Sequence, residues 1–174
     1  EHCVLDAHRH SRIIIPKAPF LIPAALNFWN MAFNFFQFWC GMMDPIIIDI
    51  WHLLGLSPLG TSFTTSYSDL SVKFSLPSLN SFYSDFVKAE NKRVGPMRDR
   101  ELFSFILYWL CKFLFCTSSQ RIMHEFAPLA KALVLMKRIA LAPYLLGLIY
   151  RACSQFCEKP LDINHGGPLW VLQL

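Results

Sequence analysis

The segment from Glu101 to Phe115 constrains the fold most, because as a helix it is apolar on nearly every side. Its polar positions recur at steps of three, four and four residues, so they share one narrow line of the helix: Glu101, Ser104, Tyr108 and Lys112. At about 1.5 Å per residue such a helix spans roughly 22 Å, which is too short for a bilayer. Other elements must therefore cover it, and we predict a central, largely buried helix that carries Trp109.

The composition agrees with a core of packed helices. Hydrophobic residues make up 54% of the 174 residues and charged residues 16%, against about 25% charged in typical domains, which excludes disorder caused by excess charge. The aromatic excess, led by sixteen Phe, suits packed helices better than an all-β sandwich. We expect a mainly α fold, a single compact multi-helix domain with a short β-hairpin, and we interpret the chain as a fragment of a longer protein.

The stretch from Ala18 to Met43 has no Asp, Glu, Lys or Arg and is long enough to span a membrane. Prolines interrupt its start, and polar residues recur at steps of three, four and three, which would draw a stripe along one side of a helix: Asn27, Asn30, Asn34 and Gln37. We therefore predict a soluble helix from about Pro23 to Gln37. The chain also lacks the order of residues found in a secretory signal, so we expect an intracellular protein.

Residues 41 to 60, GMMDPIIIDIWHLLGLSPLG, contain the start and stop signals of a short helix. Asp44 is a good N-cap, Pro45 fits the first helical position, and Gly55 stands where a left-handed C-terminal cap belongs. The predicted helix runs from Pro45 to Leu54. Its apolar face comprises Ile46, Ile47, Ile50, Leu53 and Leu54, with Asp49 and His52 off that face.

The rest of the chain alternates helices with polar connections. We predict further helices at Leu79–Ala89, Ala127–Arg138 and Ala142–Phe156, the last two with Pro128 and Pro143 in their first turns. A short strand or hairpin fits residues 61 to 77, loops fit residues 88 to 100 and 164 to 168, and LWVLQL at the end begins another helix. We divide the chain into an N-terminal arm with the first helix, residues 1–32, and a main domain, residues 33–174, that is truncated at its C-terminus.

Several residue groups permit chemistry, but each has a simpler explanation. A metal could be held by the N-terminal donors, or by two thiol pairs, or Asp49 and His52 could relay a proton one helical turn apart. No standard zinc spacing, nucleophile elbow, GxxxxGK[ST], GxGxxG or HExxH is present. We therefore expect no catalytic residue, no metal and no cofactor, and the groups in question are His2, Cys3, His8 and His10, the pair Cys111 and Cys116, and the pair Cys153 and Cys157.

Basic residues gather in the C-terminal half, although the net charge of the chain is only +4. Between residues 112 and 151 they are opposed by Glu125 alone. They could face phosphates or could form an ordinary solvated edge of the helices, and both interpretations stay open. The predicted contact residues for nucleic acid or a protein partner are Lys112, Arg121, Lys131, Lys137, Arg138 and Arg151.

Four segments in order carry a family resemblance. Residues 41 to 60 resemble the "G-x-M-x-P-x-x-x-D-x-x-x-L-x-G-L-x-x-x-G" segment of the plant mobile domain, a family also labelled aminotransferase-like. FILYWLCKFLFCTSSQRI (105–122) resembles its central helix, RIALAPYLLGLIYRA (138–152) its "LA-x-P-x-L-x-x-L-Y" helix, and GGPLWVLQL (166–174) its "GPLW-x-LQLW" element. The resemblance covers about residues 33 to 174.

The resemblance implies a nuclear domain found in plant transposable elements and in host proteins derived from them, some linked to silencing of repeats, genome stability and meristem maintenance. It implies no aminotransferase activity, because no motif here marks a pyridoxal-phosphate lysine. We expect a non-catalytic interaction module whose partner is nucleic acid or a chromatin-associated protein, with no small-molecule substrate and no membrane. The alternative is a hydrolase or transferase with an unrecognised site. The signature residues read as framework: Gly41, Pro45, Asp49, Gly55, Gly60, Trp109, Pro143, Gly167 and Trp170.

Overall fold

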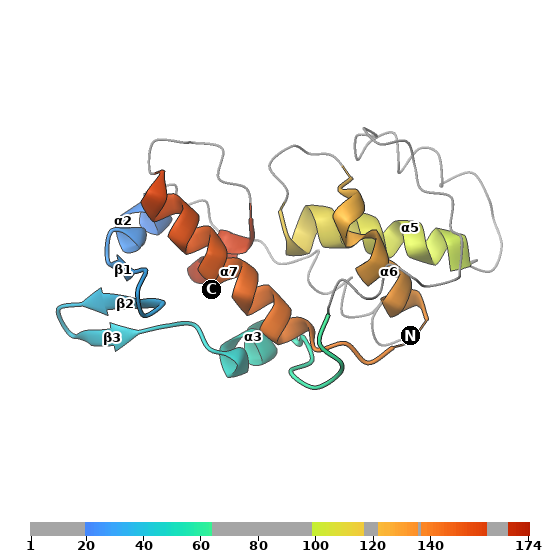
Figure 1. Ribbon diagram of the computed structural model, residues 1–174, viewed down its shortest axis with the longest axis horizontal. Helices are drawn as coiled ribbons and strands as arrows, with labels where there is room; N and C mark the ends of the chain where they lie inside the picture. The colour runs from blue at the N-terminus through green and yellow to red at the C-terminus, as the bar shows by residue number, and fades with distance from the viewer. Residues whose placement is uncertain (1–19, 64–98, 117–121, 136, 160–166) are drawn as a thin grey trace. The chain divides into compact units, whose positions relative to one another are not determined.

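The computed structural model describes residues 20–63, 99–116, 122–135, 137–159 and 167–174, whose elements are labelled along the chain in Figure 1. The described residues form two compact units. Unit 1 lies between Leu59 and Ile139, and unit 2 combines residues 20–58 with Ala140–Leu174. Helices dominate both units, and unit 2 also holds a small antiparallel sheet. The predicted mainly α class with a short β element is confirmed.

Unit 1 contains the predicted central helix. The α-helix α5, Asp99–Trp109, continues as the π-helix η2, Leu110–Leu114, and the amide of Phe115 closes its last turn on the Leu110 carbonyl at 2.8 Å. Side chains on several sides are at most 3% exposed, which confirms the burial expected of an apolar helix: Phe103, Ile106, Leu107, Trp109, Leu110 and Leu114. The apolar pattern did not predict the π-helical turn.

The helix α6, Ala127–Val134, follows the 3-10 turn η3, His124–Phe126, and packs against α5 with Pro128 in its first turn. Its predicted end at Arg138 is wrong. The Arg138 carbonyl instead accepts hydrogen bonds from the amide of Thr61 at 2.9 Å and from its hydroxyl at 3.1 Å. Arg138 therefore lies outside α6, which ends at Val134, and its carbonyl pairs with a residue far away in the sequence. Most of the predicted hairpin at 61–77, and all of the helix at 79–89, lie outside the described residues.

Unit 2 is built around α7, Leu141–Glu158, which confirms the helix predicted at 142–156 with Pro143 in its first turn (Figure 1). It contacts α2 (Leu21–Leu26), α3 (Ile47–Leu54), β1 (Trp29–Asn30) and the 3-10 helix η4 (Pro168–Gln173), which contains Trp170. The short turn η4 occupies the place where we predicted the start of another helix. On α7, one face is buried at Leu145, Leu146, Ile149, Ala152 and Cys153, and half-buried at Phe156.

The predicted helix from Pro23 to Gln37 is wrong. The strands β1, β2 (Phe35–Phe38) and β3 (Gly41–Met43) lie in this part of the chain and pair antiparallel in the order β1-β2-β3, with Trp29 opposite Phe36 and Gln37 opposite Met42. The asparagines that suggested a helical stripe make the turn between β1 and β2. The Asn30 side chain accepts a hydrogen bond from the amide of Ala32 at 3.0 Å, and Asn34 has a left-handed backbone with φ of 57°. Asparagine favours both conformations in turns.

One face of the sheet is covered by α7. Trp29 and Phe36 are buried on it with their ring centroids 4.9 Å apart, and the Trp29 ring also lies 5.6 Å from the ring of Tyr150. The indole N–H of Trp29 donates to the hydroxyl of Ser154 at 3.4 Å. Both Tyr150 and Ser154 belong to α7, so aromatic packing positions the sheet on this helix.

The short helix α3, Ile47–Leu54, confirms most of the prediction for residues 41 to 60. Gly55 ends it in a left-handed conformation, with φ of 66° and its amide bonded to the Trp51 carbonyl at 2.8 Å. The predicted N-cap is wrong, because Ile46 occupies that position and its amide donates to the carboxylate of Asp49 at 2.8 Å. A carboxylate inside the first turn can satisfy a free amide as an N-cap does.

Asp44 has another partner. The hydroxyl of Tyr150 donates to the Pro45 carbonyl at 2.8 Å and lies 3.4 Å from the Asp44 carboxylate. Burial, followed by the nearby Asp44, raises the pKa of this phenol above its ordinary value. The contact ties the segment before α3 to α7 within unit 2.

Candidate interaction surfaces

The predicted basic contact residues divide between the two units. Lys112 lies on η2, Lys131 lies on α6, and Lys137 and Arg138 follow α6, all in unit 1. The Lys112 ammonium donates to the hydroxyl of Tyr108 at 2.7 Å and lies 5.3 Å from the centre of the Phe113 ring. Arg151 is exposed on α7 in unit 2, and Arg121 lies outside the described residues. The role of these residues in nucleic-acid contact stays a prediction.

The pair Asp49 and His52 is not arranged as a catalytic pair. The Asp49 carboxylate accepts the Ile46 amide and so serves the first turn of α3. The His52 ring lies 5.1 Å from the Trp51 ring, and both residues are exposed. A proton relay requires a partner within hydrogen-bond reach and a place for substrate. Here Asp49 stabilises the first turn of a short helix, and His52 lies on the surface of that helix.

The thiols of the two predicted pairs are poorly suited to chemistry. Burial raises the pKa of Cys111 and of Cys116 to about 11, and burial, followed by the neighbouring Cys157, raises that of Cys153 to about 12. Thiolates are the nucleophilic and metal-binding form, so burial lowers the reactivity of these three cysteines at neutral pH. Among the residues that the structure describes, no group of three or more His, Cys, Asp or Glu side chains is placed to hold a metal.

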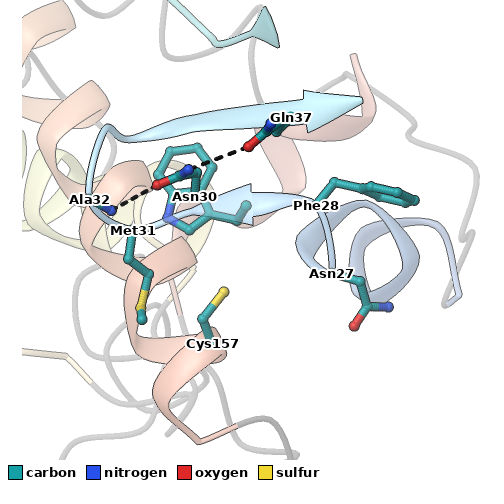
Figure 2. Close-up of a pocket in the computed structure, with 8 residues that line it drawn as sticks. Asn27, Phe28, Asn30, Met31, Ala32, Gln37 and Cys157 are labelled. Carbon is teal, nitrogen blue, oxygen red and sulfur yellow. Dashed lines mark hydrogen bonds between the residues drawn. The ribbon is translucent and has the colours of Figure 1, made fainter. Parts of the chain in front are cut away.

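A recess of about 500 Å³ lies beside the turn between β1 and β2 in unit 2. Figure 2 shows Asn30 at its centre, donating to the Gln37 side chain at 3.5 Å, with Met31 and Cys157 on the same side of the recess. None of its lining residues is a carboxylate, an imidazole or an amine, and their one titratable side chain is the thiol of Cys157, whose pKa is raised by burial. The lining residues are Asn27, Phe28, Trp29, Asn30, Met31, Ala32, Gln37 and Cys157.

A more unusual feature is the stretch from Trp39 to Leu53, here called the apolar segment, which exposes large hydrophobic side chains almost continuously. Trp39 is 98% exposed in the turn between β2 and β3, and the exposed fractions of Met42 and Met43 on β3 are 72% and 57%. On α3, Ile48 is 55% exposed and Trp51 is 49% exposed. Exposed apolar patches of this kind mark interaction sites on soluble proteins.

The sequence of α3 contains a signal for this exposed surface. Six of the eight residues of α3, IIDIWHLL, are apolar, and a helix that is apolar around most of its circumference normally requires covering on several sides. In the structure only Ile50 and Leu54 are buried, whereas the predicted core residues Ile47 and Leu53 are exposed. The helix is therefore packed against other residues on one side and exposed to solvent on the others.

The remaining glycines among the framework residues lie at positions with a positive backbone angle φ. Gly41, Gly60 and Gly167 have φ of 138°, 145° and 133°, in a region that other residues rarely adopt. A Cβ on Gly167 would lie 3.5 Å from that of Ala152, so η4 approaches α7 closely at this point. In the described part of the chain, no helix is both long enough and apolar enough to cross a membrane.

Taken together, the elements and surfaces define a mainly α domain with a small antiparallel sheet and an exposed apolar segment. The model of the family described as plant mobile domain matches residues 4–174, a range that includes both units. The chain belongs to this transposon-associated family. No curated protein and no solved structure matches it.

Proposed function

We propose that the chain is a non-catalytic interaction module that works in the nucleus and binds a chromatin-associated protein through the apolar segment of unit 2. One observation carries the proposal: a stretch of fifteen residues, Trp39 to Leu53, exposes two Trp, two Met, three Ile and one Leu side chain to solvent. Leaving such area in water costs about 25 cal/mol per Å². A partner that covers it would recover this free energy, as at the centre of a protein interface.

The family resemblance supports the cellular setting of the proposal. Relatives with this domain imply a role in silencing of transposable elements, in genome stability and in meristem maintenance, which we propose for this chain as well. The alternative, a hydrolase or transferase, gains no support from the described residues, because Asp49 and His52 do not face the recess and no third polar group joins them. A surface rather than a pocket is the distinctive feature of unit 2.

The proposal is tested by capture from plant nuclear extracts treated with nuclease. The full chain, a Trp39→Ser/Ile48→Ser variant and a Leu59→Ser/Leu135→Ser control are immobilised, and retained proteins are identified by mass spectrometry. The control removes exposed apolar side chains of unit 1. We expect the same chromatin proteins on the wild type and the control, and their loss from the first variant.

Equal capture by all three proteins would refute the role of the apolar segment. Capture that disappears on nuclease treatment would point to nucleic acid as the direct partner. A fluorescent fusion of the full chain that is excluded from plant nuclei would refute the nuclear setting.

A further inference from the structure

The charge of the apolar segment narrows the chemistry of its partner. Between residues 20 and 58 the chain has two formally charged side chains, Asp44 and Asp49, and no Lys or Arg. The whole chain carries a net charge of +4, so this part is acidic within a basic protein. Both carboxylates lie within the apolar segment and are exposed, and neither forms an ion pair with a described residue.

The negative charge of the apolar segment argues against a phosphate-bearing partner at this surface. Nucleic acids and anionic membranes are bound by surfaces rich in Lys and Arg, and the apolar segment has neither. It also argues against a second copy of the same surface, since two such segments would bring four carboxylates together. A cationic polypeptide meets no such repulsion.

The backbone of β3 suggests how that polypeptide binds. Among the described residues β3 is an edge strand, because it pairs with β2 alone, and all three of its residues are exposed. Natural edge strands are usually protected by Lys, Pro, a bulge or a covering element. The sequence of β3, GMM, has no charge and no Pro, so its outer edge is open to pairing with another extended segment.

We propose, building on the function proposed above, that the apolar segment binds an extended polypeptide in which Lys or Arg alternates with apolar residues. The peptide backbone pairs with the outer edge of β3. Because Met42 and Met43 point to opposite faces of the sheet, the apolar side chains of the peptide cover one of these two residues, beside Trp39, while its cations lie near Asp44, which directly follows the strand. The backbone beside Asp44 is held by the hydroxyl of Tyr150, which donates to the Pro45 carbonyl at 2.8 Å.

The test uses three decapeptides whose binding to the full chain is measured by fluorescence anisotropy. The first alternates Lys and Val, the second alternates Glu and Val, and the third is the Lys and Val peptide with every Val amide methylated. We expect binding of the first alone, because the second reverses the charge and the third removes backbone donors. Added salt should weaken the binding, as for other contacts between exposed charges.

Matched protein variants separate the contribution of the Asp44 charge from that of the Trp39 side chain. Asp44→Asn should weaken binding of the Lys and Val peptide roughly two- to fivefold, as expected for one exposed charge pair. Asp99→Asn removes the same charge from α5 of unit 1 and should leave binding unchanged. Trp39→Ser should weaken binding by more than tenfold if Trp39 acts as an interface anchor.

Three results would overturn the proposal. The first is equal binding of the Glu and Lys peptides, the second is equal loss in Asp44→Asn and Asp99→Asn, and the third is a concentration-dependent dimer that Trp39→Ser dissolves. Loss of nuclear capture by the Trp39→Ser/Ile48→Ser variant without binding of the Lys peptide would refute this inference and leave the proposed function standing. Unchanged capture would refute the function itself.

Discussion

Two apolar helices in this protein, α5 in unit 1 and α3 in unit 2, have opposite environments. Phe103, Ile106 and Trp109 of α5 are almost completely buried within their unit. In α3, Ile50 and Leu54 are buried, while Ile48 and Trp51 are about half exposed. The comparison teaches that apolar content specifies a helix that has to be covered, but it does not specify whether the cover comes from the same chain.

The largest expected effect is on unit 1. Trp109→Ala should lower the free energy of unfolding by about 3 to 5 kcal/mol, because it leaves a large cavity beside a buried helix. Urea denaturation followed by circular dichroism measures this loss. A loss below about 1 kcal/mol would show that α5 is not the centre of its unit, and the contrast with α3 would disappear.

The basic residues of unit 1 provide the second test, because they would make unit 1 the nucleic-acid-binding part of the protein. Changing Lys131, Lys137 and Arg138 together to Gln should flatten the salt dependence of DNA binding by roughly 0.7 to 0.9 log units per lost contact. Arg151→Gln in unit 2 should flatten it once more. Salt titrations with duplex and single-stranded DNA measure the slopes.

Equal slopes for the wild type and these variants would exclude direct phosphate contact by the basic residues. Absence of binding by the intact domain at low salt would do the same. Either result would leave a protein partner as the surviving interpretation.

A smaller effect is expected at the end of α3. Gly55→Ala should destabilise the protein by about 1 to 2 kcal/mol, the usual cost of a left-handed conformation for a residue with a Cβ. No atom lies within 4 Å of the position of the added Cβ, so the loss is a backbone effect. Gly147→Ala is the control, because Gly147 lies within a helix and has equal space around it. Thermal unfolding of the two variants separates backbone strain from any effect of the added methyl group itself. An equal loss in both variants would contradict the explanation.

The smallest effects are expected on the apolar segment. Trp39→Ser and Ile48→Ser should each change the free energy of unfolding by less than about 0.5 kcal/mol, as for other exposed positions. Ser and Ile have similar helix propensity, so α3 itself should persist. Chemical denaturation of the two variants measures the change. A loss above about 2 kcal/mol would mean that these side chains belong to a core, and the contrast with α5 would fail.

The sequence predicted the elements whose causes are local. Gly55 ends α3 because its left-handed backbone is inexpensive for glycine, and the narrow polar line of residues 101–115 led correctly to a buried helix. Pro143 and Pro128 marked the first turns of α7 and α6. Such signals depend on residues within one or two turns of each other, so they survive whatever the rest of the chain does.

Elements decided by distant partners were not predictable in this way. Asn30 and Asn34 have the spacing of a helical stripe, yet they form a turn because Trp29 pairs with Phe36 across strands and packs on Tyr150, more than 100 residues away in sequence. Arg138 lies outside α6, and its carbonyl accepts a hydrogen bond from Thr61, a residue 77 positions away in sequence. The exposure of the apolar segment was likewise not predicted, since a pattern of Ile and Leu cannot reveal where the covering elements end.

The division of unit 2 into two stretches of chain has a consequence for biosynthesis. The sheet and α3 leave the ribosome before α7, which follows roughly eighty residues later in the chain. At typical rates of translation, synthesis of these residues takes on the order of 4 to 16 s. During this interval Trp29, Phe36 and Ile50 lack the helix that buries them in the finished protein. A nascent chain stalled before residue 140 should therefore be held by a chaperone that releases the completed chain, and crosslinking of stalled ribosomes would detect that difference.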